Sequence, residues 1–295
     1  MAESIFVILN PRAGPESAEE QARRIAHRFD SEKPRARILM ARTETEIVEA
    51  ARTGIAEGAA TVVAAGGDGT VSTVAAVLAG TKIPLGVLPA GTLNHFAKDL
   101  QVPMKLEDAV RTIKNGRIEE IDLSEVNGRV FINNSSLGLY PIIVREREHQ
   151  QRMGYGKWPA FAWAALLALR RYPFLSLRME VDGRELIRST PFVFIGNNIY
   201  QMEGLDIGSR ASLMDGQMCL YVPRRTGRAG LLFLSLTALL GRLRYARNFD
   251  AFCAREVWIE TRRRRVVVAI DGEVYTMESP LHYRVRPRAL RVIVP

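Results

Sequence analysis

The sequence predicts an α/β fold, in which a Rossmann-like, mostly parallel N-terminal domain is followed by a β-rich, sandwich-like C-terminal domain. Three observations support this prediction. In the first third of the 295-residue chain, short apolar runs alternate with amphipathic stretches, which is typical of strands and helices in alternation. Two of the apolar runs end in glycine-rich turns. From residue 118 onward, strand-like segments separated by turns predominate.

The first third of the chain supplies the elements of the parallel sheet. Apolar runs mark the expected strands, which lie at residues 4–9, 37–41 and 61–65 and before Leu88. Amphipathic stretches mark the expected helices, at residues 17–29 and 44–57. In the first helix, Ala22, Ile25, Ala26 and Phe29 share one face. The loops after the third and fourth strands lie at strand carboxyl ends, where parallel sheets bind ligands.

The remainder of the chain is expected to be β-rich. A strand from Ile118 to Val126 is followed by Asn127-Gly128, a strong hairpin signal, and by a strand at residues 129–133. A domain boundary is therefore expected between residues 125 and 135, and we divide the chain into domains 1–130 and 131–295. Further strands are expected at residues 176–181, 191–196, 217–222, 257–260, 266–270 and 290–294.

Composition and charge limit the class of protein. The chain is 47% hydrophobic and 25% charged, which is a globular composition. Its 41 Lys and Arg residues outnumber 32 Asp and Glu residues, for a net charge of +9. This excess favours an anionic partner, such as nucleic acid, a phospholipid surface or a phosphorylated small molecule.

Cysteine usage and apolar segments bear on the compartment. Cys219 and Cys253 do not form a Cys-x-x-Cys pair, so neither a disulfide framework nor a thiolate zinc site is expected. The N-terminal residues lack the pattern of a secretory signal. The apolar stretches 158–169 and 229–241 fall short of the about 20 residues that a spanning helix needs. We therefore expect a cytoplasmic protein in a reducing environment.

The strongest local signal is Gly66-Gly67-Asp68-Gly69-Thr70, which follows an apolar strand and opens a helix. Glycines let backbone amides approach phosphate oxygens, and a helix N-terminus favours anions. No Gly-Lys-Ser/Thr follows, so the segment is not a Walker A loop, and its glycine spacing differs from the dinucleotide fingerprint. The segment indicates a site for nucleotide phosphates with Asp68 near Mg²⁺, and a glycine-rich turn without a ligand is the alternative.

The segment from Leu85 to Lys98 contains Pro89-Ala90-Gly91-Thr92-Leu93-Asn94-His95-Phe96-Ala97. It closely resembles the Pro-x-Gly-Thr-x-Asn-Asp-Phe-Ala motif of the diacylglycerol kinase catalytic family. The glycine loop is similar to the phosphate loop that this family shares with NAD kinases and phosphofructokinases. His95 stands where the family has aspartate, and it is either a phosphate contact or a surface histidine. The resemblance covers nearly the whole chain and implies that residues 290–295 return to the first domain.

The resemblance also implies which residues bind the nucleotide. Residues 10–14 look like the first nucleotide loop of the family, and Thr43 stands where the family has a nucleotide-contacting threonine. Thr43 is equally suited to be a helix N-cap, because Glu46 follows at capping-box spacing. The expected nucleotide-binding residues are Asn10, Pro11, Arg12, Gly14, Thr43, Gly66, Gly67, Asp68, Gly69, Thr70, Gly91, Thr92 and Asn94.

Two further segments resemble family motifs that contain carboxylates. Asp271-Gly272-Glu273 matches the family triplet that contains the general base, for which we prefer Asp271 over Glu273. A hairpin turn is the structural alternative for this triplet. The segment Leu213-Met214-Asp215-Gly216 resembles one that holds structural Mg²⁺ in some members, and a plain turn explains Asp215 equally well. The expected catalytic residues are thus Asp271, Glu273 and Asp68, and the expected metal ligands are Asp68 and Asp215.

The function implied by the resemblance is that of an ATP- and Mg²⁺-dependent kinase, which phosphorylates a hydroxyl of a lipid such as diacylglycerol. The alternatives are an NAD kinase-like enzyme and a non-catalytic lipid- or nucleotide-binding protein of the same fold. Arg262–Arg265 form either a solvated charge run or part of a surface that contacts anionic membrane lipids. The apolar segments 159–169 and 231–240 either line an acyl-chain cleft or belong to the core. Nucleic acid is not expected as a partner, and a homodimer is compatible with the sequence.

Overall fold

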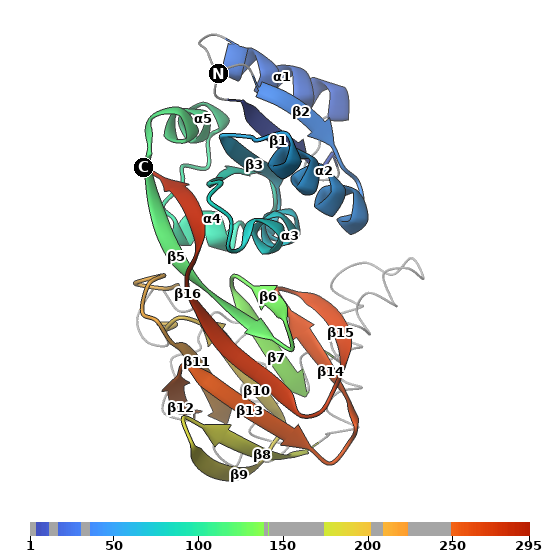
Figure 1. The fold of residues 1–295 in the computed structure, drawn as a ribbon, viewed down its shortest axis with the longest axis vertical. Helices are drawn as coiled ribbons and strands as arrows, with labels where there is room; N and C mark the ends of the chain where they lie inside the picture. Colours follow the sequence, from blue (N-terminus) through green and yellow to red (C-terminus); the bar gives the residue numbers. More distant parts are fainter. Residues whose placement is uncertain are drawn as a thin grey trace. The chain divides into compact units, whose positions relative to one another are not determined.

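The computed structural model describes residues 4–11, 17–30, 36–138, 141, 174–201, 209–223 and 249–295. The chain forms two compact units (Figure 1). The first contains the residues up to Leu123 together with Arg286–Pro295, and the second contains Ser124–Val285. The apolar segments 159–169 and 231–240 lie outside the described residues.

The first unit is built on a parallel sheet. Its strands are β1 (Ile5–Leu9), β2 (Ala36–Met40), β3 (Thr61–Gly66) and β4 (Leu85–Pro89). They lie in the order β2-β1-β3-β4, and Val292 of β16 (Leu281–Val294) pairs in parallel with Leu85 of β4. All of β1 and nearly all of β3 are buried, which explains why these strands are continuous apolar runs.

Helices connect the strands of this sheet. They are α1 (Ala18–Asp30), α2 (Glu44–Ala56), α3 (Asp68–Leu78), α4 (His95–Asp99) and α5 (Leu106–Asn115). The expected apolar face of α1 is confirmed, because Ile25 and Phe29 are buried while Ala22 and Ala26 are half-buried. Helices α4 and α5 have no counterpart among the expected elements. α4 has five residues and α5 has ten, so both are shorter than the window of about 11–18 residues over which a helical period is recognised.

The second unit has two antiparallel sheets. In one, β13 (Glu256–Thr261) pairs with the first part of β16 and with β8 (Leu175–Val181), which pairs with β9 (Arg184–Thr190). The other has the order β12-β11-β10-β7-β14-β15. Its strands are β7 (Asn134–Gly138), β10 (Phe192–Asn197), β11 (Met218–Pro223), β12 (Phe249–Ala254), β14 (Arg265–Ile270) and β15 (Glu273–Glu278). The predicted fold class is therefore confirmed.

Two strands take part in both units. β5 (Arg117–Val126) begins in the first unit and ends in the second, where it forms a hairpin with β6 (Arg129–Phe131). The predicted Asn127-Gly128 turn is confirmed, and both of its residues have positive φ. β16 begins in the second unit and ends in the first. The expected strand at residues 290–294 is only the last part of β16.

The core of the second unit consists of apolar side chains from both sheets. Phe131, Leu137, Met179 and Ile259 belong to it and are fully buried. Tyr283 is also buried in this core, among the apolar side chains. Its hydroxyl lies 3.0 Å from Ser135 Oγ, within hydrogen-bond distance. Burial raises the pKa of Tyr283 well above its usual range, so this hydroxyl stays neutral and hydrogen-bonded.

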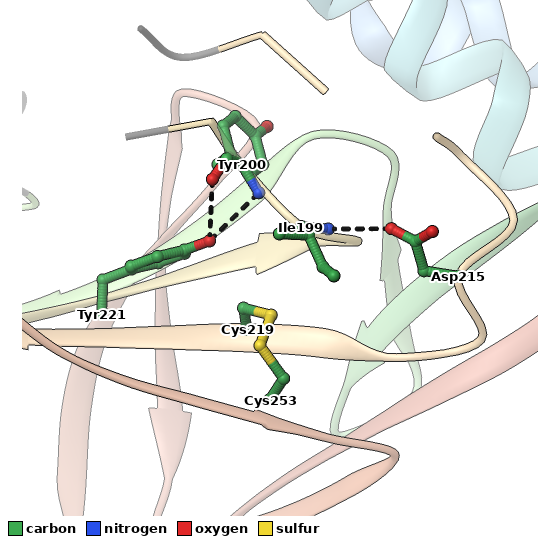
Figure 2. The surroundings of a disulfide bond; sticks show 6 residues. All are labelled: Ile199, Tyr200, Asp215, Cys219, Tyr221 and Cys253. Atoms are coloured by element: carbon green, nitrogen blue, oxygen red, sulfur yellow. Dashed lines mark hydrogen bonds between the residues drawn. A yellow bond between two sulfur atoms is a disulfide. The ribbon is translucent and has the colours of Figure 1, made fainter. Parts of the chain in front are cut away.

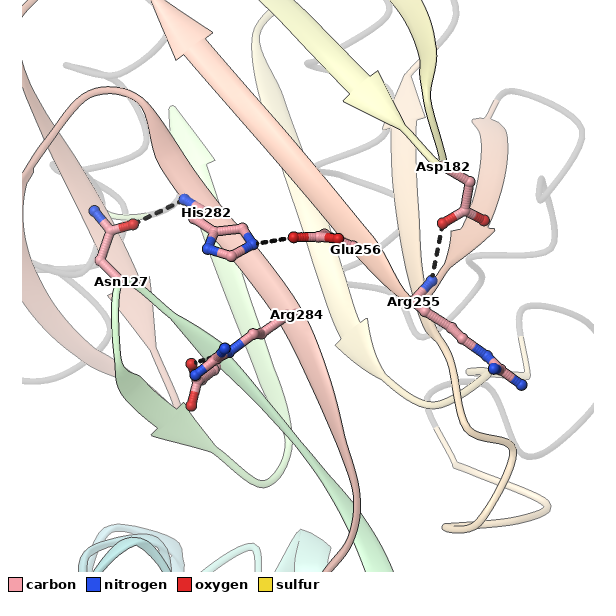
Figure 3. A network of polar contacts seen from close by, with 7 residues as sticks. Asn127, Asp182, Arg255, Glu256, His282 and Arg284 are labelled. Carbon is pink, nitrogen blue, oxygen red and sulfur yellow. Dashed lines mark hydrogen bonds and ion pairs between the residues drawn. The ribbon is translucent and has the colours of Figure 1, made fainter.

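The exposed side of β13 and β16 carries a network of polar contacts, which Figure 3 shows. His282 is paired with Glu256, and its ring stacks on Trp258 with the centroids 3.9 Å apart. Arg284 is paired with Glu125. The Glu125 side chain is buried, whereas His282 and Glu256 are partly exposed. Exposed ion pairs each stabilise a protein by only about 0–1 kcal/mol, so we expect the buried apolar core to contribute more to the stability of this unit than the exposed pair. None of the helices in the described part of the chain is long and apolar enough to cross a bilayer.

Candidate active site

Three loops follow the carboxyl ends of β1, β3 and β4 in the first unit. These strands are in register, with Leu9 beside Ala65 and Gly66 beside Pro89, so the loops begin at one edge of the sheet. The backbone links them beyond the strands as well, because Ala90 N–H donates to the Gly66 carbonyl at 3.0 Å. The edge expected to bind a ligand therefore contains Asn10, the segment Gly66–Thr70 and the segment Gly91–Asn94.

The closest approach between these loops is made by two glycines. A Cβ on Gly91 would lie 2.5 Å from the Gly67 Cα, a distance that real Cβ atoms do not tolerate. A Cβ on Gly66 would lie 2.6 Å from Thr70 Oγ1, and that hydroxyl also accepts a hydrogen bond of 3.0 Å from Asn10 Nδ2. Packing alone thus favours glycine at Gly66 in the expected phosphate loop and at Gly91 in the second loop. Among the three glycines of the segment Gly66–Thr70, Gly69 has open space where a Cβ would stand.

The second loop is held by Asn94, which has a left-handed backbone with φ of 51°. Its Oδ1 accepts a hydrogen bond from Gly91 N–H at 2.9 Å, and its Nδ2 donates to the Gly91 carbonyl at 2.8 Å. Asparagine tolerates this backbone conformation and closes such turns with its side-chain amide. Asn94 therefore shapes the loop, whereas Thr92 and His95 are exposed.

Asp68 is the first residue of α3, and it connects the two glycine loops. Its Oδ1 accepts a hydrogen bond of 3.3 Å from Phe96 N–H, in the first turn of α4. Among the residues that the structure describes, none donates to its other oxygen, Oδ2. The start of α3 has backbone amides without intrahelical partners and a favourable dipole for anions, since Gly67 supplies no side-chain cap. A half-buried carboxylate at this place fits a role beside a phosphate-bound Mg²⁺.

Thr43 is the N-cap of α2. Its Oγ1 accepts a hydrogen bond of 3.2 Å from Glu46 N–H, so the capping interpretation is confirmed. The Glu46 carboxylate accepts from Arg42 N–H at 2.6 Å, and this bond lowers the pKa of Glu46. The cap uses Thr43 Oγ1 as an acceptor and leaves its hydroxyl proton unused. The predicted nucleotide contact of Thr43 is therefore compatible with its role as a cap. Of the first expected loop, Asn10 and Pro11 are described, whereas Arg12 and Gly14 lie outside the described residues.

Asp271 lies in the second unit, at the turn between β14 and β15. Ile270 pairs with Glu273 across a two-residue turn in which Asp271 and Gly272 have φ of 47° and 90°, so the hairpin alternative is confirmed. The Asp271 carboxylate also accepts three backbone hydrogen bonds, of 2.9 to 3.0 Å. The donors are the N–H groups of Ile132, Asn133 and Asn134. Both carboxylate oxygens are therefore held in a fixed orientation.

Glu273 differs from Asp271 in its surroundings. Its carboxylate is exposed and accepts a short hydrogen bond from the Tyr275 hydroxyl. The guanidinium of Arg129 lies 3.9 Å from the centre of the Tyr275 ring. Sequence reasoning missed Tyr275, although the two-residue period of a strand puts Glu273 and Tyr275 on one face. It also missed the segment Ile132–Asn134. This segment binds Asp271 through backbone N–H groups, which nearly every residue type has, so the amino-acid sequence does not reveal it.

Asp215 lies in a turn before β11. Its Oδ2 accepts a hydrogen bond of 3.4 Å from Ile199 N–H (Figure 2). Its own N–H donates to Asn198 Oδ1 at 3.0 Å. The described residues contain no cluster of three or more His, Cys, Asp or Glu side chains that could hold a metal. Asn198 Nδ2 is buried without a hydrogen-bond partner, and a donor is not a metal ligand. The residues present fit a turn better than a metal site.

The expectation for the cysteines is wrong. Cys219 of β11 and Cys253 of β12 form a disulfide (Figure 2), although 34 residues separate them. The reason is register: the two strands are antiparallel neighbours, and these residues stand directly opposite each other. Sequence spacing carries no information about such a cross-strand pair. The cysteine count therefore gives no support to a reducing compartment.

Comparisons with known proteins give a consistent result. The family model of the diacylglycerol kinase catalytic domain matches residues 4–126, and that of the YegS C-terminal NAD kinase beta sandwich-like domain matches residues 141–294. A diacylglycerol kinase of Mycobacterium tuberculosis is 31% identical over 248 residues, which cover 82% of this chain and 79% of that protein. A probable YegS-like lipid kinase of Pectobacterium atrosepticum is also 31% identical over 248 residues, covering 79% and 78%.

The fold has solved counterparts. A crystal structure of a diacylglycerol kinase from Bacillus anthracis superimposes with a TM-score of 0.72, covering 100% of this chain and 97% of that one. Its sequence is 19% identical, so this likeness bears on the fold alone. It agrees with the parallel sheet of the first unit and the antiparallel sheets of the second.

The contact between Gly67 and Gly91 leads to a prediction about stability. Gly91→Ala should lower the free energy of unfolding by about 1–3 kcal/mol, because its Cβ would push the two loops apart. The matched control is Gly69→Ala. Its Cβ meets open space within α3, so it should raise the free energy of unfolding by about 0.5–1 kcal/mol. Urea unfolding of both variants measures whether the free energy of unfolding falls in Gly91→Ala and rises in Gly69→Ala. An unchanged midpoint for Gly91→Ala would contradict the packing argument.

Proposed function

Because the chain belongs to the diacylglycerol kinase family, we propose that it is an ATP-dependent lipid kinase, which transfers the γ-phosphoryl group to a hydroxyl of a lipid such as diacylglycerol. The names of its relatives support a kinase acting on a lipid. The single observation that carries the proposal is the junction of two glycine loops at the start of α3. There, backbone amides and a helix dipole are available to phosphate oxygens.

In the proposed mechanism, the residues of the first unit bind and orient ATP. The amides of Gly66, Gly67 and Gly69 would contact phosphate oxygens, and Thr70 and Asn10 keep the loop in place through their mutual hydrogen bond. Thr43, Thr92 and Asn94 are further proposed nucleotide contacts. Mg²⁺, when bound, would neutralise charge on the phosphates, with Asp68 as its proposed protein ligand. Phosphoryl transfer needs positioning and charge stabilisation more than covalent chemistry.

The proposed general base is Asp271, which would accept the proton of the lipid hydroxyl at one of its carboxylate oxygens. Its three backbone hydrogen bonds favour the ionised form and fix the direction of both oxygens. Glu273 is the second candidate, since it is exposed and, within the described part of the chain, its carboxylate accepts a hydrogen bond from the Tyr275 hydroxyl alone. Asp271 thus offers an acceptor held by three backbone donors, and Glu273 offers an exposed acceptor on β15.

A direct assay tests the proposed activity. Purified protein incubated with labelled ATP, Mg²⁺ and a total lipid extract should give a labelled lipid, whose identification names the substrate. Asp68→Ala should abolish the transfer while leaving the fold intact, because a half-buried carboxylate at the start of α3 contributes little to the apolar core. Labelling of added NAD in place of lipid would favour the NAD kinase-like alternative, and no transfer to any acceptor would favour a binding protein.

The choice of base leads to a second prediction. Asp271→Asn should lower turnover by roughly 10² to 10⁴ with little change in ATP affinity, the usual scale for losing a general base. Glu273→Gln is the matched control, since both changes replace one oxygen by an amide nitrogen. Steady-state kinetics together with ATP binding by calorimetry separate the two effects. A larger loss of turnover in Glu273→Gln would identify Glu273 as the base.

We also propose that the enzyme contacts an anionic membrane surface. Arg262, Arg263 and Arg264 connect β13 to β14 and are exposed, in a chain of net charge +9. Each basic residue near an anionic surface contributes about 1 kcal/mol of attraction. Replacing Arg262 and Arg263 by Gln should therefore weaken sedimentation with phosphatidylglycerol-containing vesicles by roughly tenfold or more. Arg111→Gln in the first unit is the control, and binding that does not respond to salt would contradict the proposal.

A further inference from the structure

The segment Ile132–Asn134, which follows β6 and includes the first residue of β7, contacts Asp271 with all three of its backbone N–H groups. Most of the segment is buried, because Ile132 is fully covered and Asn133 is 6% exposed, while Asn134 is half-buried. Asp271 returns one hydrogen bond, from its own N–H to the Asn134 carbonyl at 2.9 Å. The orientation of the carboxylate is thus set by this piece of backbone.

The carbonyl side of the same segment is bound by Arg210. Its Nη1 donates to the Ile132 carbonyl at 2.6 Å, and its Nη2 donates to Asn133 Oδ1 at 2.9 Å. The Ile132 carbonyl and the Asn133 N–H belong to one peptide group. Arg210 therefore contacts one end of a peptide dipole whose other end contacts Asp271.

The next peptide group repeats this arrangement. The Asn133 carbonyl accepts hydrogen bonds from the Tyr200 hydroxyl at 3.0 Å and from Asn197 N–H at 2.9 Å. The N–H of that peptide, on Asn134, donates to Asp271 Oδ1 at 3.0 Å. Two successive peptide groups are thus polarised in the same direction, with donors at their carbonyls and the carboxylate at their amides.

Arg210 is held rigidly enough for this role. It is 6% exposed, and its guanidinium lies 5.4 Å from the centre of the Tyr200 ring. Tyr200 is fixed in turn by Tyr221, whose hydroxyl accepts from Tyr200 N–H at 3.0 Å and donates to its carbonyl (Figure 2). The ring packs so closely that a Cβ on Gly196 would lie 2.4 Å from it.

From this geometry we propose that Arg210 is a positioning residue for Asp271, acting through the peptide groups of Ile132–Asn134; the proposal rests on the role of Asp271 in the proposed kinase. A charge-assisted hydrogen bond at a carbonyl polarises the peptide and strengthens the hydrogen bond that its N–H donates. In a buried site this effect is less screened than in water. Arg210 thereby stabilises the ionised carboxylate and fixes its direction, without contacting the substrate.

The experiment compares Arg210→Met, Arg210→Lys and Tyr200→Phe with wild type and with a control, Arg178→Met, an exposed arginine of the same unit that pairs with Glu185. Turnover, the KM for ATP and the pH dependence of turnover are measured for each. Arg210→Met should lower turnover by roughly tenfold or more at unchanged KM for ATP. It should also move the acid limb of the pH profile upward by about one pH unit, because the ionised carboxylate loses support.

The conservative variants separate positioning from a merely structural role. Arg210→Lys keeps the charge but loses the planar fork, so its acid limb should lie between those of wild type and Arg210→Met. Tyr200→Phe removes one donor and should move the acid limb in the same direction by less. The other ionisable groups on β6, β14 and β15 are Arg129, Arg265, Glu273, Tyr275 and Glu278, and Tyr283 of β16 contacts Ser135 of β7. The control Glu273→Gln shows whether the observed limb belongs to Glu273.

A direct titration keeps the test independent of activity. Carbon-13 NMR of aspartate-labelled protein follows the Asp271 carboxyl, identified by the signal lost in Asp271→Asn. Its titration midpoint should rise in Arg210→Met or, if that variant does not fold, in Arg210→Lys and Tyr200→Phe. Folded variants with an unmoved midpoint and an unmoved acid limb would overturn the proposal. If the protein transfers no phosphate but the titration midpoint of Asp271 still rises in the variants, the proposed kinase function is refuted, while the proposed effect of Arg210 on Asp271 is retained.

Discussion

The site in the first unit depends on the contact between the backbones of Gly67 and Gly91. At this distance no side chain fits on Gly91, and the strand ends that carry the two loops are fixed by the sheet. Once the loops meet, Asp68 can reach the start of α4, and Asn94 can close its turn around Gly91. The polar contacts at this edge therefore follow from a packing constraint, and glycine is required at position 91 before any ligand is considered.

Several positions carry two roles that sequence reasoning treats as alternatives. Thr43 caps α2 and still has a hydroxyl proton to donate. Asp271 occupies the left-handed position of a tight turn, and its carboxylate is held by three amides. A residue suited to a turn is also rigidly placed, which is what a reacting group needs. A structural explanation of such a residue is therefore no argument against a chemical one.

The sequence predicted the fold class because its signals are local. Apolar runs, the face of α1, the glycine turns and the Asn127-Gly128 hairpin are each visible within a few residues. What it could not predict depends on pairing between distant strands. The disulfide follows from the register of β11 and β12, and the support of Asp271 follows from the backbone of Ile132–Asn134. Backbone donors are the same for every residue type, so neither motif nor composition reveals them.

The course of β16 affects how the chain can fold during its synthesis. Val292 and Val294, near the end of this strand, are buried in the first unit, and Val292 pairs with Leu85 of β4. The sheet of that unit therefore lacks this strand until translation has passed through the whole of the second unit. Domains that are contiguous in sequence fold in order as they emerge from the ribosome. The first unit, in contrast, is complete only after its last strand, at the end of the chain, has been synthesised. Until then, the exposed edge of β4 is a surface for which a chaperone could compete.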